Sequence, residues 1–280
     1  MPEVRADLQR EGAAPPLEEP PNIFSLANHP PWVIADWRFQ KYPRELHIGR
    51  TRADNRRLFA KLQAEADAER RGEIFHEYVT VQFSLHEWDR QKSTNARRSI
   101  RNSYVRFLRG WSLDSNSIEG AVLKAWVASR FGLEPIFHYE VLEESPEMRE
   151  RFEIERVCGE SKTNAIFQQL DLLFEFCQEE LTRRFGRRKH IRLYRGTFDA
   201  EKYPRVLRPE ATLPVVRLNN LNSFTSDRET AWEFGSTVWE VDVPLAKIFF
   251  FSGLLPTSLL RGEGEFLVLG GEYEIRTILF

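Results

Sequence analysis

The chain has 280 residues, enough for one large domain or two small ones, and 41% of them are hydrophobic. Its formal net charge is −2 at pH 7, so the sequence implies no general attraction to nucleic acid or to a membrane surface. No apolar run is long enough to span a bilayer, and the N-terminus lacks the apolar core of a signal peptide. The two cysteines, Cys158 and Cys177, lie in helix-like segments without metal-ligand spacing. We therefore predict a soluble, cytoplasmic protein in a reducing compartment.

The first 48 residues are expected to be irregular. Residues 1–21 are acidic and rich in proline, which predicts a disordered tail. Residues 22–48 carry aromatic side chains among prolines, and we expect them to lie as a packed belt on the domain. We interpret residues 22–280 as a single domain, of which 22–189 is mainly helical and 190–280 is rich in strands.

Helical periodicity dominates the chain from residue 53 to about residue 180. The strongest pattern covers residues 163–185, where apolar side chains recur every three or four positions and Gly186 follows as a helix stop. Ser145 and Pro146 are typical of an N-cap and a first helical turn, and Gly72 is interpreted as a C-cap. The predicted helices are 53–71, 73–88, 96–108, 118–131, 146–158 and 163–185.

After His190 the pattern changes to short strands. A brief helix over 227–234 interrupts them, and Ser226 with Glu229 offers it a capping box. The sequence therefore predicts an α+β fold in which a helical N-terminal half packs on a β-rich C-terminal half. The predicted strands are 191–194, 214–218, 221–226, 238–243, 247–251, 266–269 and 273–280.

Two carboxylates precede the apolar strand Phe266–Leu269. Strand side chains alternate, so Glu263 and Glu265 are expected to project from the same face. Such a pair suits a reaction that builds positive charge, as when a glycosidic bond breaks. The alternative is a solvated acidic turn that leads into a core strand.

Several well-known sites are excluded by their missing motifs. The chain has no Gly-x-x-x-x-Gly-Lys loop, and Gly262-x-Gly264 is followed by Leu267 where the dinucleotide-binding fingerprint requires glycine. The six histidines are scattered and form no metal-binding pair at helical spacing, and no Gly-x-Ser-x-Gly elbow is present. We expect no metal site.

Three short elements follow one another in the β-rich half. The first is Leu193-Tyr194-Arg195-Gly196, the second is Ser223-Phe224-Thr225-Ser226, and the third is Glu263-x-Glu265. Each is weak alone, because Arg195 could form a structural ion pair and Ser226 could serve only as a helix cap. The three are informative only together, through their order and spacing.

Together the three elements resemble the Arg–Ser–Glu class of mono-ADP-ribosyltransferases over residues 191–280. More closely, the chain after the tail resembles the dinitrogenase reductase ADP-ribosyltransferases of nitrogen-fixing bacteria. This resemblance rests on its length, its helical first half, and the Asn-Ser-Phe-Thr-Ser and Gly-Glu-Gly-Glu-Phe contexts. It implies one ADP-ribosyltransferase domain whose NAD-binding core, residues 190–280, consists of two small antiparallel or mixed sheets.

The resemblance implies that NAD is the substrate and assigns roles to the motif residues. Arg195 would hold the pyrophosphate through its forked guanidinium, and Gly196 would let the backbone approach it. Glu265 would be the catalytic glutamate, hydrogen bonding a ribose hydroxyl and stabilising the positive charge on the ribose. Thr225 and Ser226 would hold Glu265 and the nicotinamide end in place.

Glu263 would select arginine as the acceptor, since in this class a glutamate at that position accompanies modification of arginine. A guanidinium is permanently charged and cannot attack until a proton leaves it, so a second carboxylate can orient it and accept that proton. The middle motif departs from the Phe-x-Ser-Thr-Ser pattern of the class. Among the hydroxyls that could contact Glu265 we therefore name Ser226 first and Ser223 last.

The same resemblance implies the partners. The acceptor would be the nitrogenase iron protein (dinitrogenase reductase), whose modification stops nitrogen fixation, and a PII signalling protein would regulate the enzyme. Two alternatives stay open: an NAD glycohydrolase, and a non-catalytic NAD-sensing or protein-binding module. We also hypothesise that the helical half forms the surface on which the target docks.

Overall fold

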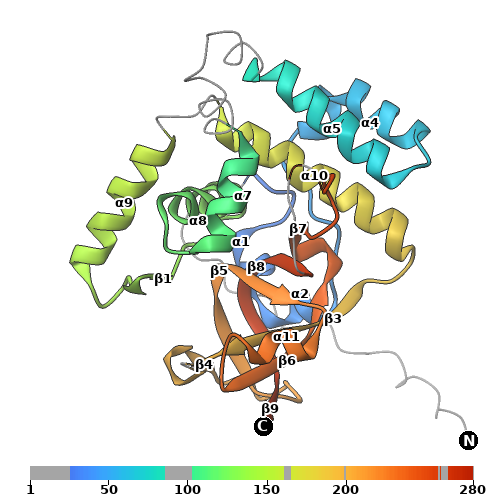
Figure 1. Cartoon of the computed structure of the whole chain (residues 1–280). Coiled ribbons are helices and arrows are strands. Elements are labelled where there is room, and N and C mark those ends of the chain that lie inside the picture. The colour runs from blue at the N-terminus through green and yellow to red at the C-terminus, as the bar shows by residue number, and fades with distance from the viewer. Residues whose placement is uncertain are drawn as a thin grey trace, which may run out of the picture.

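The structure is a computed structural model that describes residues 26–85, 103–160, 165–198, 200–257, 259 and 264–279. It has the predicted α+β architecture, with helices in the first part of the chain and a sheet in the last part. Figure 1 shows most of the helices gathered at one end of the molecule and the sheet at the other. Residues 1–21, which we predicted to form a tail, lie outside the described residues.

The N-terminal belt is packed as predicted, but it is partly helical. It contains α1 (Pro31–Ala35) and α2 (Trp37–Lys41), and the Asp36 side chain accepts the backbone N–H of Arg38 to begin α2. Trp37 and Phe39 are buried. A belt of aromatic residues among prolines therefore folds into two single-turn helices once its rings are buried.

Two short 3-10 helices, Ala200–Lys202 and Leu245–Lys247, lie in the β-rich half, and the remaining α-helices of the described residues lie between residues 51 and 232. They are α3 (Thr51–Asp54), α4 (Arg56–Ala64), α5 (Ala68–Gln82), α7 (Tyr104–Leu113), α8 (Ile118–Phe131), α9 (Pro146–Glu160), α10 (Ile166–Phe185) and α11 (Arg228–Trp232).

The predicted helix 53–71 is wrong, because the chain there forms α3, α4 and the start of α5. Asp67 is the N-cap of α5, because its side chain accepts a hydrogen bond from the backbone N–H of Arg70. Gly72 lies inside α5 and is no C-cap. A Cβ at Gly72 would lie 2.9 Å from Pro256 Cδ, so glycine is required there by a close approach of the chain.

The strands form one hairpin and one larger sheet. The hairpin pairs β1 (Phe137–His138) with β2 (Glu140–Val141). The larger sheet has seven antiparallel strands in the order β7-β8-β5-β3-β6-β9, with β4 paired to β5. Its strands are β3 (His190–Thr197), β4 (Arg205–Val206), β5 (Val215–Thr225), β6 (Thr237–Pro244), β7 (Ile248–Phe251), β8 (Glu265–Glu274) and β9 (Arg276–Leu279).

The expected two small sheets are therefore joined into one. The junction is narrow, because β3 and β5 pair through a single residue pair, Tyr194 with Thr225. On either side of it, β3 pairs along its whole length with β6, and β5 pairs along most of its length with β8. Strands β3 and β5 are therefore paired only at Tyr194 and Thr225, and Arg195 is the residue that follows this pair on β3.

A bulge in β5 fastens the helical half to the sheet. The register between β5 and β8 shifts between Leu218 and Leu221, where the sequence predicted a break between two strands. The Asn220 side-chain amide donates to the carbonyl oxygens of Lys124 (2.7 Å) and Leu133 (2.9 Å). A side chain from the bulge of the sheet therefore contacts both the middle of α8 and the segment that follows this helix.

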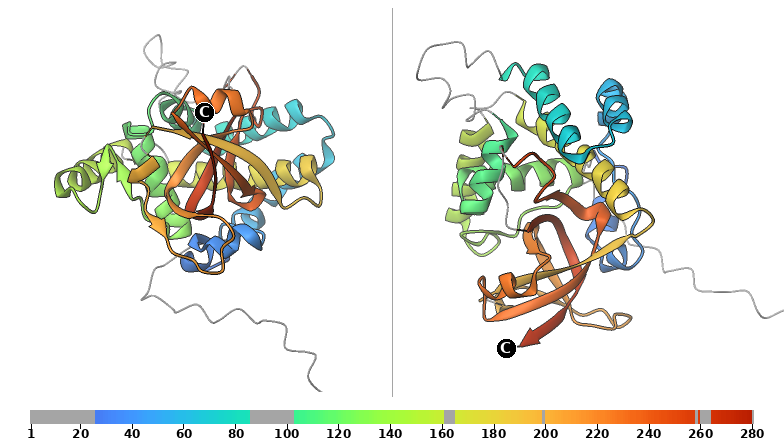
Figure 2. Two further views of the ribbon diagram at one scale, coloured as in Figure 1. Left: turned by 90° about the horizontal axis from the view of Figure 1, so that it is seen from below. Right: turned by 45° about the vertical axis from the view of Figure 1, so that its right-hand side comes forward.

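The hydrophobic core also draws on both halves of the chain. One cluster of buried residues runs from Ile34 to Ile275 and includes the inner faces of α8 and α10 and the whole of β7. The Gln178 amide on α10 donates to the Ile248 carbonyl of β7 at 2.8 Å. Figure 2 shows α10, in yellow, beside the sheet both from below and with the right-hand side of the molecule turned forward.

We expect Asp171→Ala to destabilise the helical layer strongly. The buried Asp171 carboxylate accepts hydrogen bonds from Trp126 Nε1 (2.8 Å) and from Arg130 Nε (2.8 Å) and Nη2 (3.0 Å), and so joins α10 to α8. Its loss leaves a buried cation without its carboxylate, which should cost about 3–5 kcal/mol of unfolding free energy in denaturant titrations.

The control is Glu150→Ala on the exposed face of α9, which should change the unfolding free energy by less than about 0.5 kcal/mol. Equal small effects of the two substitutions would show that Asp171 does not join the two helices.

Candidate active site

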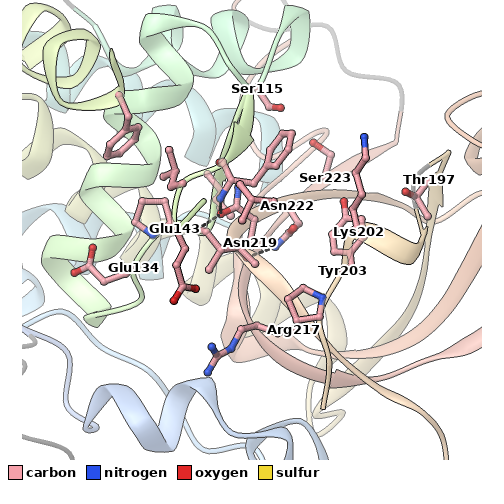
Figure 3. A pocket seen from close by; sticks show the side chains of 18 of the residues that line it. Ser115, Glu134, Glu143, Thr197, Lys202, Tyr203, Arg217, Asn219, Asn222 and Ser223 are labelled. Atoms are coloured by element: carbon pink, nitrogen blue, oxygen red, sulfur yellow. Dashed lines mark hydrogen bonds between the residues drawn. The ribbon is translucent and has the colours of Figure 1, made fainter. Parts of the chain in front are cut away.

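A cavity of about 720 Å³ lies between the sheet and the helical half. One wall comes from the sheet and includes Arg195, Gly196, Asn219, Asn222 and Ser223. The opposite wall includes Glu134–Phe137, Val141 of β2 and part of α9. Figure 3 shows Glu134 and Glu143 on the helical side and Lys202 and Tyr203 on the sheet side, with Asn219 and Asn222 between them.

Arg195 links the first predicted motif to the second. Its Nη1 donates to the Ser223 carbonyl oxygen at 2.8 Å, and its Nη2 donates to the Tyr203 hydroxyl at 2.9 Å. The Nε–H group is buried and has no hydrogen-bond acceptor within the part of the chain that the structure describes. Because Arg195 lines the cavity, its remaining N–H groups are donors that an anionic ligand can use.

Ser223 links the second motif to the third. Its hydroxyl donates to Glu265 Oε1 at 2.6 Å. The two residues lie on neighbouring antiparallel strands, where Thr225 pairs directly with Glu265 and Ser223 is two positions further along the same face. The backbone N–H of Glu265 donates to the Ser252 hydroxyl at 2.9 Å, which fixes the start of β8. Arg195, Ser223 and Glu265 are therefore joined by a continuous chain of hydrogen bonds.

The other predicted site residues lie nearby in different roles. The Thr225 hydroxyl accepts the backbone N–H of Asp227 at 3.1 Å, and Asp227 rather than Ser226 caps α11. Ser226 is exposed just after the end of β5. The order in which we named the hydroxyls is thus reversed, since the one that bonds Glu265 belongs to Ser223.

The remaining two predicted site residues are Gly196 and Glu263. A Cβ at Gly196 would lie 1.9 Å from the Ala231 carbonyl oxygen, so this glycine lets β3 approach α11 closely. Gly196 also lines the cavity. Glu263 lies outside the described residues.

Two residues that sequence reasoning missed reach the same site from α7. Trp111 Nε1 donates to the Ser223 hydroxyl at 2.8 Å, and the Ser112 hydroxyl lies 3.1 Å from Glu265 Oε2. Both residues fall in a helical stretch where a tryptophan is typical of the core and a serine of the surface. No local signal in the sequence distinguishes them.

Two buried basic residues, Lys124 and His138, lie next to each other near the Trp111 ring. Lys124 Nζ is 3.0 Å from His138 Nδ1 and 6.0 Å from the centre of the Trp111 ring, and His138 Nε2 is 2.9 Å from Glu155 Oε2. Burial lowers the pKa of Lys124 to about 7, although the negative charges of Asp114 and Glu155 act to raise it.

Burial and the nearby ammonium also lower the pKa of His138 to about 4. Near pH 7 the neutral imidazole therefore accepts from Lys124 through Nδ1 and donates to Glu155 through Nε2.

An arginine and a serine that line the cavity, with a glutamate hydrogen bonded to that serine, form the arrangement expected of a mono-ADP-ribosyltransferase of the Arg–Ser–Glu class. Comparison with known proteins agrees with this. Residues 24–277 match the sequence model of the dinitrogenase reductase ADP-ribosyltransferase (DRAT) family. The chain belongs to this family.

One curated relative is the NAD(+)--dinitrogen-reductase ADP-D-ribosyltransferase of Rhodospirillum rubrum. The two sequences are 40% identical over 257 residues, which cover 90% of this chain and 93% of the relative. No solved structure matches the chain. Each helix in the described parts of the chain is too short or too polar to cross a membrane.

We expect the buried Lys124 to make stability rise with pH between 7 and 9. In this range the unfolded chain keeps a proton that native Lys124 has released, so the free energy of unfolding increases with pH. Lys124→Met should lower that slope by up to about 1.4 kcal/mol per pH unit, measured by denaturant titration at several pH values.

Lys247 is also buried and has a pKa lowered to about 7, so part of the slope should persist in the variant. Lys41→Met, at an exposed position, should leave the slope unchanged. Parallel curves for wild type and Lys124→Met would contradict the expected ionisation of Lys124.

Proposed function

We propose that this protein transfers ADP-ribose from NAD to an arginine of dinitrogenase reductase and thereby inactivates nitrogenase. The observation that carries the proposal is the hydrogen-bonded chain Arg195–Ser223–Glu265 beside the cavity. The Rhodospirillum rubrum relative, 40% identical over most of both chains, is named for its use of NAD and its action on dinitrogenase reductase, which supports the proposed substrate and acceptor.

The cavity has the size and the donors that NAD requires. Its volume of about 720 Å³ lies within the range of roughly 300–1,000 Å³ that is typical of small-molecule sites. Arg195 would hold the pyrophosphate with N–H groups that its bonds to Ser223 and Tyr203 leave unused, and its buried Nε–H would gain an acceptor. Gly196, Thr225 and Ser226 complete the proposed NAD-binding set.

Glu265 would be the catalytic glutamate. When the bond between ribose and nicotinamide breaks, nicotinamide leaves with the bonding electrons and positive charge develops on the ribose. A carboxylate held at the site of that charge stabilises the transition state without having to reorient. Glu265 is held in this way, because the Ser223 hydroxyl fixes Oε1 and the Ser252 hydroxyl fixes its backbone N–H.

Glu263 would direct the reaction to arginine. A guanidinium nitrogen forms the new bond to the ribose only after the guanidinium gives up a proton, and Glu263 is proposed to accept it. Without this second carboxylate, water would attack in place of arginine, and the enzyme would release nicotinamide as an NAD glycohydrolase.

The proposal also includes a regulatory protein and a cellular location. Regulation by a PII signalling protein rests on the family resemblance, and a titration with purified PII protein that detects no complex would contradict it. A cytoplasmic location is supported by Cys177, a fully buried thiol that donates to the Ile248 carbonyl. Recovery of the tagged protein outside the cytoplasm would contradict it.

The test is transfer of labelled ADP-ribose from NAD to purified dinitrogenase reductase. Glu265→Gln should lower both transfer and nicotinamide release at least about 100-fold, because it removes the charge that stabilises the transition state. Glu263→Gln should abolish transfer while nicotinamide release continues.

Glu150→Gln, on the exposed face of α9, is the matched control and should retain both activities. If wild type neither labels dinitrogenase reductase nor releases nicotinamide, the catalytic proposal fails and the non-catalytic module is favoured. If wild type releases nicotinamide but labels no protein, the glycohydrolase is favoured.

A further inference from the structure

The last turn of α7 contacts the Ser223–Glu265 pair from the helical half of the chain. Trp111 Nε1 is 2.8 Å from Ser223 Oγ, and Ser112 Oγ is 3.1 Å from Glu265 Oε2. These contacts connect residues 112 and 153 positions apart in the chain. Glu265 is therefore contacted on both carboxylate oxygens, one by Ser223 and one by α7.

The available protons determine the direction of each hydrogen bond. An indole N–H can only donate, so Ser223 Oγ must accept from Trp111. The hydroxyl of Ser223 has a single proton, and the 2.6 Å contact to Glu265 Oε1 uses it. Because the Trp111 N–H occupies a lone pair of Ser223 Oγ, the single Ser223 proton points away from Trp111 and toward Glu265.

Ser112 makes a weaker contact with the second carboxylate oxygen. Its single hydroxyl proton has two acceptors at 3.1 Å, Glu265 Oε2 and the Leu108 carbonyl one turn earlier in α7. Each carboxylate oxygen has two acceptor sites, so Oε2 can accept from Ser112 and still accept a ribose hydroxyl.

Helix α7 is fixed firmly enough to place these two side chains. Trp111 is 4% exposed, and its ring lies in the main hydrophobic cluster. The backbone N–H of Tyr104, at the start of the helix, donates to Gln169 Oε1 at 2.9 Å, and Arg109 Nη2 donates to the Leu259 carbonyl at 2.5 Å. Such support from neighbouring elements is what holds a reacting group in its productive geometry.

We propose that Trp111 and Ser112 are positioning residues for ADP-ribose transfer. Trp111 acts through Ser223 to orient Glu265 Oε1, and Ser112 steadies Oε2. This inference rests on the proposed function, in which Glu265 stabilises charge on the ribose. It assigns to the helical half a role in positioning the proposed catalytic glutamate, separate from any role in docking the target.

The experiment is a double-mutant cycle on nicotinamide release from NAD. Trp111→Phe keeps most of the apolar ring and removes the N–H, so kcat should fall about 10-fold while KM for NAD stays nearly constant. Since Trp111 acts through the Ser223 hydroxyl, Trp111→Phe should cause little further loss in a Ser223→Ala background.

Two further variants separate positioning from a purely structural role. Trp126→Phe removes another buried indole N–H, but this one donates to Asp171 and not to Ser223 or Glu265. The variant should therefore leave kcat within about twofold of wild type. Ser112→Ala should lower kcat less than Trp111→Phe does, because its proton is shared with Leu108, and Ser112→Thr should restore it.

The inference is overturned if Trp111→Phe leaves kcat unchanged, if it lowers kcat equally with and without the Ser223 hydroxyl, or if Trp126→Phe lowers kcat as much. Each of these outcomes presupposes an active wild type. A wild-type protein that releases no nicotinamide would instead overturn the proposed function.

Discussion

Ser223 makes the hydrogen bonds on which the arrangement of the site depends. Its backbone carbonyl accepts from Arg195, its hydroxyl donates to Glu265, and the same hydroxyl accepts from Trp111. Three segments that are far apart in the sequence thus converge on one residue at the narrow junction of β3 and β5. Ser223 thereby connects Arg195 and Glu265, which we propose to hold the pyrophosphate and the ribose of NAD.

The sequence predicted the three motifs because each has a local pattern, but it could not show which hydroxyl faces Glu265. That choice depends on strand register, and the pairing of Thr225 with Glu265 places Ser223 on the same face and leaves Ser226 beyond the strand. Gly72 was misinterpreted as a helix end for a similar reason, since the need for glycine comes from Pro256 across the fold. Helix α8 was predicted with its observed bounds because its cap, apolar face and stop are all local.

The helical half contributes to the site itself. It supplies one wall of the cavity, and the Asn220 amide in the bulge of β5 fastens α8 to the sheet. From that framework α7 extends to Ser223 and Glu265. Docking of the target on these helices stays a hypothesis, and variants that lower target labelling while nicotinamide release is retained would support it.

We infer that the main chain and the side chain of Ser223 serve different ends of NAD, and the kinetics of Ser223→Ala test this division. The variant keeps the carbonyl that holds Arg195 and loses the hydroxyl that holds Glu265. Nicotinamide release should then show a kcat lowered about 10-fold or more with KM for NAD nearly unchanged. A raised KM with an unchanged kcat, or no change in either, would contradict the claim.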